Sequence, residues 1–473
     1  MIWIAGSWVL AFGVAWVVHG IYKWYNPKCN GLLPPGSMGL PFIGETLQLM
    51  EAGYSFDIVP FLKKRLQRYG PIFRTSVAGR QVIVSADPQF NHFIFQEDGK
   101  LFESWYLDSF AKIFKQEGAS TNVAHIHKYV RSMTLNHFGV IALKEKLLPQ
   151  LEEMVQKVLH NWSCQASINV KYASATMALE FGAKQLISYD PQQSSEKITD
   201  SYISLIRGLM SFPLNFPGTA YYKCMKDRKK AMNMVREVLK QRLASPPEKR
   251  QGDFLDHVIQ DMNSQDFLIE DFVVQLFFGL LYVSFDTIST MTTLTFKLLD
   301  ENPDVLQELI VEHEAILKKR EKPGSSITWN EYKSMSFTLQ VINEVLRLGN
   351  MTPGLFRRTL ADVQVNGYTI PAGWPIMIAT SALHLNSEIF NDPLAFNPWR
   401  WKDRKSNEMS KNFMPFGEGM KQCAGAEYTR VFLAIFIHVL VTKYRWMKIM
   451  GGDICRNPFI GFGKGLHIKV MEN

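Results

Sequence analysis

A cysteine with glycines on both sides is the group in this sequence best suited to binding a metal. Cys423 lies in the run 416–425, which begins at Phe416 and leads directly into an apolar helical pattern. Glycines let a backbone approach a flat ligand closely, and a helix N-terminus is expected to lower the thiol pKa towards the metal-binding thiolate. A lone cysteine is more often a small buried hydrophobic residue, so other residues must support this site.

An acid beside an alcohol lies in the middle of a long apolar stretch. Asp286 and Thr287 fall within residues 272–299, which are apolar almost all round and are predicted to form a helix through the interior. A buried carboxylate needs a partner or a proton, so Asp286 either pairs with a cation elsewhere in the chain or is functional. A second membrane span is the competing interpretation, but a charge at mid-bilayer is costly.

Glu344 and Arg347 form a third candidate group. Their spacing places them on one face of a helix predicted to begin at the capping box Thr328-x-x-Glu331 and to end near Gly349. By itself such a pair is usually a surface salt bridge that contributes little to stability.

The elements that must position these residues are mostly helical. Apolar residues recur at three-to-four spacing in 149–162, 225–243 and 302–319. Two hairpins are predicted, one from 72–77 and 81–85 and one from 363–365 and 368–370, which flank Asn366-Gly367. The fold class is therefore mainly α with a minor β portion.

Composition limits the partners. The chain has 473 residues, a net charge of +8 and five dispersed cysteines, so neither a disulfide framework nor a zinc site is indicated. The positive charge favours contact with anionic lipid, nucleic acid or an acidic protein. Because no aromatic-basic nucleic-acid motif is present, we expect lipid and protein partners and no nucleic acid.

The first residues predict a membrane anchor. Residues 2–18 carry no charged side chain and are long enough to cross a hydrocarbon core of about 30 Å. We expect an anchor over 1–24, a proline-rich hinge over 25–40 and one large domain over 41–473. A cleaved signal peptide is the alternative, but a basic leading region is missing. Lys23 and Lys28 then predict that the remainder faces the cytosol.

The sequence resembles the cytochrome P-450 superfamily over essentially the whole length of the chain. The motifs follow one another in the order of that family: the Pro-Pro-Gly hinge, Asp286-Thr287, Glu344-x-x-Arg347, Phe396-Asn397-Pro398-Trp399-Arg400 and the cysteine loop. Within this superfamily, the sequence is similar to the plant clan of sterol and triterpenoid oxidases, and most of all to plant triterpenoid hydroxylases. The resemblance implies the cytochrome P-450 fold preceded by an N-terminal transmembrane helix. The residues that carry the closer likeness are Leu33-Pro34-Pro35-Gly36-Ser37-Met38-Gly39-Leu40-Pro41, Phe216-Pro217-Gly218-Thr219, Phe396-Asn397-Pro398-Trp399-Arg400-Trp401 and Cys423-Ala424-Gly425-Ala426-Glu427.

The resemblance also implies residue roles. The cofactor would be haem b, with its iron axially ligated by Cys423. Asp286 and Thr287 would be the catalytic acid–alcohol pair that supplies protons to dioxygen, and Glu344, Arg347 and Arg400 would brace the cysteine side of the haem. The residues implied to hold the haem, including its propionates, are Cys423, His127, Arg131, Arg357, Lys421 and Phe416.

Four positions depart from the usual pattern of this family, one of them being Ile288, which replaces a second hydroxyl residue in the central helix. Lys421 stands where arginine is common, which keeps the charge but loses the two-pronged fork. Glu418 replaces a glycine, and the sequence gives no physical reason for it. Ser284 replaces a glycine in the central helix, where its hydroxyl is expected to bond back to a helix carbonyl.

The implied activity is that of a monooxygenase in the endoplasmic reticulum membrane, spanning it once, with its catalytic domain in the cytosol. Electrons would come from NADPH through NADPH-cytochrome P-450 reductase, because nothing in the chain resembles a flavin or nicotinamide site. Basic residues near the cysteine would steer that acidic partner, although a plain solvated charge run explains each one equally well. They are Lys402, Arg404, Lys405, Lys411 and Lys421.

The expected substrate is a bulky apolar molecule, either a triterpenoid or a phytosterol. Candidate pocket segments, rich in Phe, Leu and Met, are 105–110, 205–212, 277–283, 351–356 and 459–462. Two other functions stay open. One is a haem-thiolate isomerase or dehydratase that needs neither dioxygen nor reductase, and the other is a non-catalytic haem-binding protein.

Overall fold

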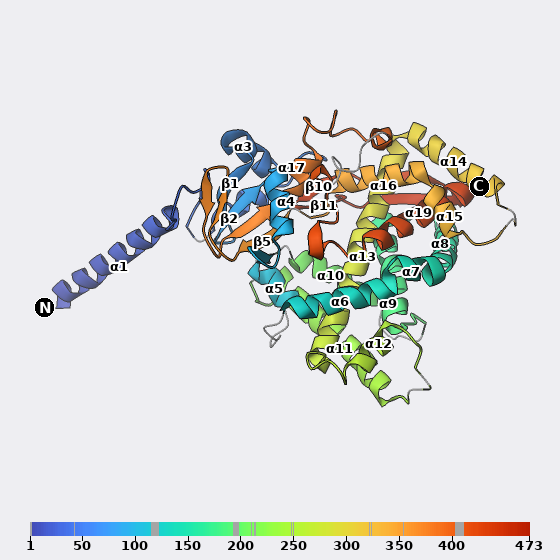
Figure 1. Cartoon of the computed structure of the whole chain (residues 1–473), viewed down its shortest axis with the longest axis horizontal. Helices are drawn as coiled ribbons and strands as arrows, with labels where there is room; N and C mark the ends of the chain where they lie inside the picture. The colour runs from blue at the N-terminus through green and yellow to red at the C-terminus, as the bar shows by residue number, and fades with distance from the viewer. Residues whose placement is uncertain are drawn as a thin grey trace.

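The computed structural model shows a helix-rich body with a smaller β-rich part beside it (Figure 1). It describes residues 2–41, 43–114, 123–192, 198–209, 211, 214–246, 248, 250–320, 322, 324–352, 354–402 and 411–473. The mainly α fold class with a minor β portion is confirmed.

The longest helix, α13 (Glu270–Glu301), runs through the interior as its apolar sequence predicts. It packs against α9 (Val170–Ile187), α11 (Ala220–Ala244) and α16 (Ser336–Gly349). In the described part of the chain, α13 is the helix that is long and apolar enough to cross a membrane, but 50% of its most apolar window is buried inside the protein. Those packing partners make α13 a core helix.

Shorter helices surround α13, and the predicted helices at 149–162, 225–243 and 302–319 are confirmed as α8, α11 and α14. The remaining helices are α1 (Ile2–Tyr25), α2 (Thr46–Leu49), α3 (Pro60–Tyr69), α4 (Pro88–Gln96), α5 (Asp108–Phe114), α6 (Val123–Phe138), α7 (Val140–Ala142), α8 (Leu148–Ser163), α10 (Ile198–Leu209), α12 (Phe254–Asp261), α14 (Pro303–Lys318), α15 (Trp329–Ser334), α17 (Thr380–His384) and α19 (Ala426–Lys443).

The strands form a five-stranded sheet in the order β1-β2-β8-β5-β3, a three-stranded sheet β4-β12-β9, and the pairs β6-β7 and β10-β11. Their bounds are β1 (Ile72–Val77), β2 (Arg80–Ser85), β3 (Phe102–Ser104), β4 (Ile168–Asn169), β5 (Leu355–Thr359), β6 (Val363–Val365), β7 (Tyr368–Ile370), β8 (Pro375–Ile378), β9 (Tyr444–Gly451), β10 (Cys455–Asn457), β11 (Phe459–Gly461) and β12 (Leu466–Glu472).

Both predicted hairpins are confirmed. Asn366 and Gly367 join β6 to β7 with φ values of 48° and 80°, the left-handed pair that a two-residue hairpin turn requires. Ala78 and Gly79 join β1 to β2 in the same way, with φ values of 50° and 73°. Arg80 belongs to β2 and pairs with Val77, so this turn is one residue shorter than the sequence suggested.

The helix predicted from Thr328 to Gly349 is two helices, which corrects the sequence interpretation. The capping box between Thr328 and Glu331 is present, but the helix is interrupted at Met335, where ψ is 64° and α15 gives way to α16. The carboxylate of Glu312 on α14 then accepts hydrogen bonds from the backbone N–H groups at the start of α16. This cap comes from another helix, so local sequence could not reveal it.

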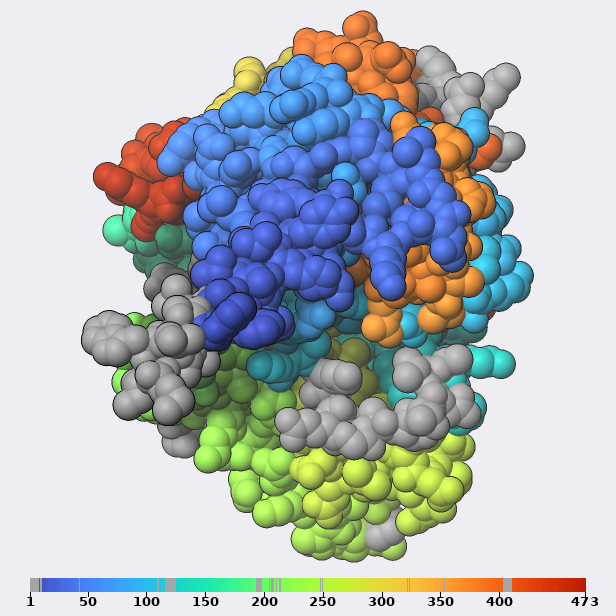
Figure 2. Space-filling model, turned by 90° about the vertical axis from the view of Figure 1, so that its left-hand side faces the viewer, coloured from blue at the N-terminus to red at the C-terminus, as the bar shows by residue number. Residues whose placement is uncertain are grey.

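Helix α1 projects away from the body, beside the β-rich part (Figure 1). Its base is held by a hydrogen bond of 2.8 Å from the Tyr25 hydroxyl to the Gly39 carbonyl. The apolar side chains of Phe12 and Trp16 are exposed. Figure 2 views the molecule from the side towards which α1 points, with the N-terminal segment in dark blue beside the orange segment that contains β5 to β8. Insertion of α1 into a membrane stays a prediction, as do the domain boundaries.

Candidate active site

The loop around Cys423 curls so that both of its ends meet. The Cys423 N–H donates to the Phe416 carbonyl at 2.9 Å, and Gly417 and Gly419 adopt φ values of 68° and 72° that favour glycine. A Cβ on Gly425 would lie 3.8 Å from the Cys423 sulfur. The predicted glycine-lined loop is therefore present, and it leaves the thiol accessible at the start of α19.

The predicted lowering of the Cys423 pKa is wrong in sign. Desolvation by the surrounding protein raises the pKa of the Cys423 thiol above its ordinary value. The Gly425 N–H, Arg131 and Arg430 act in the opposite direction without reversing it. Arg430 also lies over the Phe416 ring, 4.8 Å from its centroid. A metal ion deprotonates a coordinating thiol outright, so a bound cation, more than the helix end, would make this group a thiolate.

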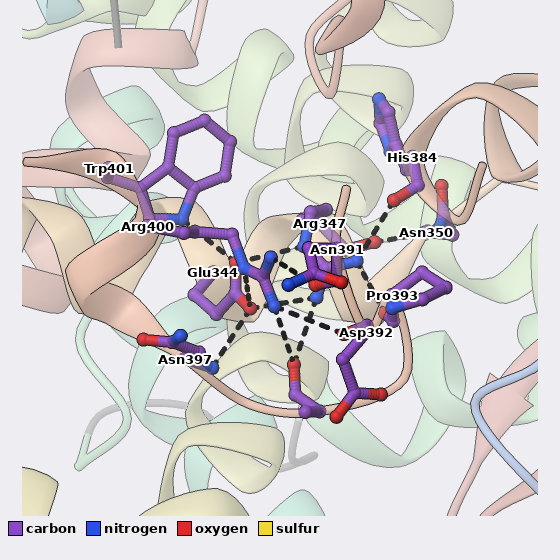
Figure 3. A network of polar contacts seen from close by, with 11 residues as sticks. Glu344, Arg347, Asn350, His384, Asn391, Asp392, Pro393, Asn397, Arg400 and Trp401 are labelled. Atoms are coloured by element: carbon purple, nitrogen blue, oxygen red, sulfur yellow. Dashed lines mark hydrogen bonds and ion pairs between the residues drawn. The ribbon is translucent and has the colours of Figure 1, made fainter. Parts of the chain in front are cut away.

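The brace predicted from Glu344, Arg347 and Arg400 is assembled, as Figure 3 shows. Arg347 meets the Glu344 carboxylate with two nitrogens, at 2.9 and 2.7 Å, and Arg400 Nε lies 3.0 Å from Glu344 Oε1. The carboxylate also accepts from the Asn397 N–H and the Trp401 indole. Glu344 and Arg347 are both fully buried, so this is a satisfied internal network and not a surface salt bridge.

His384 connects that brace to the cysteine loop, and sequence reasoning missed it. Its carbonyl accepts from Arg347 at 2.9 Å, and its ring Nε2 accepts from the Met414 N–H at 3.0 Å. Burial, followed by the charge of Arg347, lowers the pKa of His384 to about 3. The ring is therefore neutral and can accept. Nothing in the local sequence around His384 indicates this role.

The residues predicted to hold propionates converge. His127 and Arg131 lie four residues apart on α6, and Arg131 donates to the carbonyl of Gln422, next to Cys423. Burial lowers the pKa of His127, and the charges of Lys421, Arg131 and Arg357 lower it further. These side chains come from three separate parts of the chain and meet beside the cysteine loop, while their role as haem ligands stays a prediction.

A carboxylate that the sequence did not indicate lies among these cations. Asp98 is 4% exposed, and its oxygens lie 2.9 Å from Lys421 Nζ and 3.2 Å from Arg357 Nε. The charged groups that act on His127 are thus three cations and one carboxylate, which leave two positive charges. A haem b carries two propionates, so the residues present fit that group in charge as well as in offering a thiol to its iron.

The cation that Asp286 needs is Lys171 on α9. Lys171 Nζ donates to Asp286 Oδ1 at 2.7 Å, to the Asp286 carbonyl at 3.0 Å and to Ser289 Oγ at 2.9 Å, and it also contacts Thr290. Burial lowers the pKa of Lys171, while Asp286 raises it. Asp286 is therefore tied to a partner 115 residues away in sequence, which spacing alone could not identify.

Thr287 lies on the open side of α13. Thr287 and Val283 are both exposed although they sit in the middle of a core helix, and a Cβ on Gly279, one turn earlier, would meet nothing within 4 Å. The Thr287 hydroxyl makes a long contact of 3.4 Å to the Val283 carbonyl, which leaves it free for stronger partners. Ser284 donates to the Leu281 carbonyl at 2.8 Å, as predicted, and a Cβ on Gly182 of α9 would come within 2.7 Å of its hydroxyl.

Aromatic contacts join the predicted pocket segments. Trp105 packs on Phe356 with ring centroids 5.6 Å apart, which brings 105–110 to 351–356. Phe114 contacts Phe278 and Tyr282 of α13 at 5.7 and 4.9 Å. Segments 105–110 and 351–356 therefore contact each other, and 277–283 lies within α13. Phe212, in a fourth segment, lies outside the described residues.

The basic residues near the cysteine divide into two groups. Lys402 and Lys411 are exposed, whereas Lys421 is directed at Asp98 and has only 24% of its side chain exposed. Arg404 and Lys405 lie outside the described residues. Lys421 therefore belongs to the internal cation cluster rather than to a surface patch.

Known proteins similar to this chain agree on one family. The family profile "Cytochrome P450" matches residues 34–464. A β-amyrin 16-α-hydroxylase of Maesa lanceolata is 49% identical over 99% of both chains, and a cucurbitadienol 11-hydroxylase of Siraitia grosvenorii is 50% identical over 96% of both. The solved structure of retinoic acid bound cyanobacterial CYP120A1 superposes with a TM-score of 0.82 at 25% identity, covering 94% of this chain and 100% of that one.

Proposed function

Since this chain belongs to the cytochrome P450 family, we propose that it is a membrane-bound monooxygenase that hydroxylates a triterpenoid or a phytosterol. It is a cytochrome P450 monooxygenase with haem as its cofactor. The observation that carries the substrate proposal is that two relatives about half identical to it over nearly their full length are named as hydroxylases of β-amyrin and cucurbitadienol.

We assign Cys423 as the axial ligand of the haem iron. When bound, the haem supplies activation of dioxygen and insertion of one oxygen atom into a C–H bond. Phe416 and the glycines of the loop hold the Cys423 backbone, and His384, which Arg347 of the brace contacts, holds Met414 just before the loop. Arg131, Arg357 and Lys421 bind the propionates as cations, and His127 acts as a neutral donor.

We assign proton transfer to Asp286 and Thr287. The Thr287 hydroxyl would donate a hydrogen bond to the oxygen being activated, and its long contact of 3.4 Å to the Val283 carbonyl leaves it available to do so. Asp286 would take up a proton from solvent on its second carboxylate oxygen and pass it to that hydroxyl, while Lys171 holds the first oxygen in place. General acid catalysis of this kind contributes about 10²- to 10⁴-fold to a rate.

The substrate lies against the open side of α13. This surface is apolar and has few hydrogen-bonding groups, so it suits a fused-ring hydrocarbon that is bound by burial rather than by polar contacts. Its side chains are those of Val283, Trp105, Tyr106, Phe110 and Phe356. Val283 is 59% exposed and lies one turn from Thr287, so we place it against the substrate near the reacting carbon.

Helix α1 anchors the enzyme in the endoplasmic reticulum membrane, with the remaining chain in the cytosol. Its exposed apolar side chains and Lys23 at its end support this arrangement. Electrons come from NADPH through NADPH-cytochrome P-450 reductase, which docks near the exposed Lys402 and Lys411.

The test uses microsomes that contain this chain and the reductase, with β-amyrin, cucurbitadienol and phytosterols as substrates. A hydroxylated product that requires NADPH supports the proposal. Product without NADPH would instead indicate an isomerase or dehydratase, and a normal carbon-monoxide haem spectrum with no product from any substrate would indicate a non-catalytic haem protein. Cys423→Ala should abolish the haem-thiolate spectrum, whereas Cys164→Ala, which changes an exposed cysteine, should preserve it.

A further inference from the structure

Two close polar side-chain contacts join the cysteine loop to the end of α4. Glu418 Oε1 of the loop lies 2.7 Å from His92 Nδ1 on α4, and Lys421 Nζ of the loop lies 2.9 Å from Asp98 Oδ1 just after α4. The loop contributes the carboxylate to one contact and the ammonium group to the other. A shift in register would separate Lys421 from Asp98 and Glu418 from His92, so the two contacts together favour one alignment of these segments.

The backbones of the two segments touch between these two contacts. Gly419 has a φ of 72°, and a Cβ there would lie 2.8 Å from the carbonyl oxygen of Phe95 in the last turn of α4. A Cβ on Gly99 would lie 3.9 Å from the Met420 side chain. The loop thus lies flat against α4 and its following turn, and only glycine at 419 allows this approach.

Asp98 extends the same contact to a third segment. Its second oxygen lies 3.2 Å from Arg357 Nε on β5, and the Arg357 guanidinium lies over the Phe95 ring at 5.3 Å. A single buried carboxylate therefore fixes the relative positions of Lys421 and Arg357. Buried charges of this kind are strongly coupled to their partners, because removal of either one leaves an uncompensated charge.

We propose that His92 and Asp98 are positioning residues that clamp the cysteine loop through Glu418 and Lys421, and that this clamp sets how firmly Cys423 holds the haem iron. The two departures from the family pattern in this loop, Glu418 and Lys421, are then halves of one device. The proposal rests on the assignment of Cys423 as the iron ligand.

The test is a double-mutant cycle on the full-length, haem-loaded chain. His92→Gln and Glu418→Gln are made singly and together, and the readouts are the rate of haem transfer to apomyoglobin and the fraction of the carbon-monoxide complex with a thiolate spectrum. Each single change should raise the transfer rate by about threefold, in line with a polar contact between two partly exposed side chains. The double variant should be no faster than the worse single, because the pair is already broken.

A second set of variants examines Asp98 and Lys421. Lys421→Met and Asp98→Asn should each lower the thiolate fraction and raise the transfer rate by about tenfold or more, whereas Lys421→Arg should retain both near the wild-type values. Glu97→Gln is the matched control, because Glu97 is the neighbour of Asp98 and pairs only with the exposed Lys100 among the described contacts. If Asp98→Asn does not fold, the His92 and Glu418 cycle decides, since both side chains are partly exposed.

The clamp is overturned if the effects of His92→Gln and Glu418→Gln simply add, or if both leave the thiolate fraction and the haem transfer rate unchanged. A wild-type chain without a thiolate spectrum would instead overturn the proposed function. A normal wild-type spectrum with unaffected clamp variants removes the clamp alone.

Discussion

Lys171 Nζ lies 2.7 Å from Asp286 Oδ1, which joins α9 to the middle of α13 at the acid proposed to supply protons. The same ammonium group also donates to the Asp286 carbonyl and to Ser289. All the acceptors that Lys171 Nζ contacts in the described structure therefore belong to α13. This relationship makes the position of the Asp286 carboxylate depend on a residue far outside the α13 motif.

Lys171→Met should therefore impair proton delivery without removing the haem. We expect product formed per NADPH consumed to fall about tenfold, with the missing electrons appearing as peroxide, because Asp286 loses the cation that holds it. This loss is smaller than the 100-fold or more expected for removal of a general acid, as in Asp286→Asn. Lys184→Met, which changes an exposed lysine on the same helix, is the control. An unchanged ratio of product to NADPH would contradict this role.

Thr287 gives a prediction that separates its hydroxyl from its bulk. Thr287→Ala removes the hydroxyl that donates the proton in the final step of the proposed transfer. The amount of product formed per NADPH consumed should therefore fall by about tenfold to 100-fold. Thr287→Ser keeps the hydroxyl and should stay within about threefold of the wild type. Equal loss in both variants would show that the methyl group, not the hydroxyl, is what matters.

The parts of this site that local sequence predicted are those set by local chemistry. The Asn366-Gly367 turn formed because both residues tolerate left-handed backbone, and the loop at Cys423 formed because its glycines do. The partners supplied by distant segments were not predictable. Lys171 and Asp98 lie 115 and 323 residues from the side chains that they pair with, and their own neighbours in sequence carry no sign of those pairings.

The pKa of Cys423 illustrates the same limit. A helix N-terminus is visible in sequence, and its effect on a thiol extends only over the first turn. Desolvation depends on every segment that packs around the sulfur, which only the folded chain defines, and here it is the largest cause and acts upwards. Glu418 was likewise unexplained until the structure placed His92 against it.

Glu344→Gln tests the brace. The change keeps the shape of the side chain but leaves Arg347, which is fully buried, without its counter-charge. Breaking a buried pair by neutralising one partner costs about 3–5 kcal/mol, so we expect a large fall in the midpoint of thermal unfolding and poor haem incorporation. Glu308→Gln, an exposed change on α14, should leave both as in the wild type. A Glu344→Gln variant that retains the wild-type midpoint would refute this.

His384 makes stability depend on pH in a defined direction. Burial and the charge of Arg347 lower the pKa of His384 from 6.5 to about 3 in the folded chain. The unfolded chain therefore takes up a proton before the folded chain does. The contribution of His384 to the free energy of unfolding is fully present above about pH 6.5. It is lost as the pH falls towards 3, by up to about 1.4 kcal/mol per pH unit.

His384→Gln removes that proton uptake and keeps an acceptor for the Met414 N–H. The thermal midpoint of the haem-loaded variant should therefore fall less steeply than that of the wild type between pH 6.5 and 4.5. Some slope will persist, because burial also lowers the pKa of His313 to about 3 and that of His438 to about 4. Phe413→Leu is the matched control, since it removes a ring that contacts His384 at 5.2 Å but leaves the titrating group. That variant should be less stable at every pH with the wild-type slope, and a His384→Gln variant with the same slope as Phe413→Leu would show that His384 does not couple folding to protons.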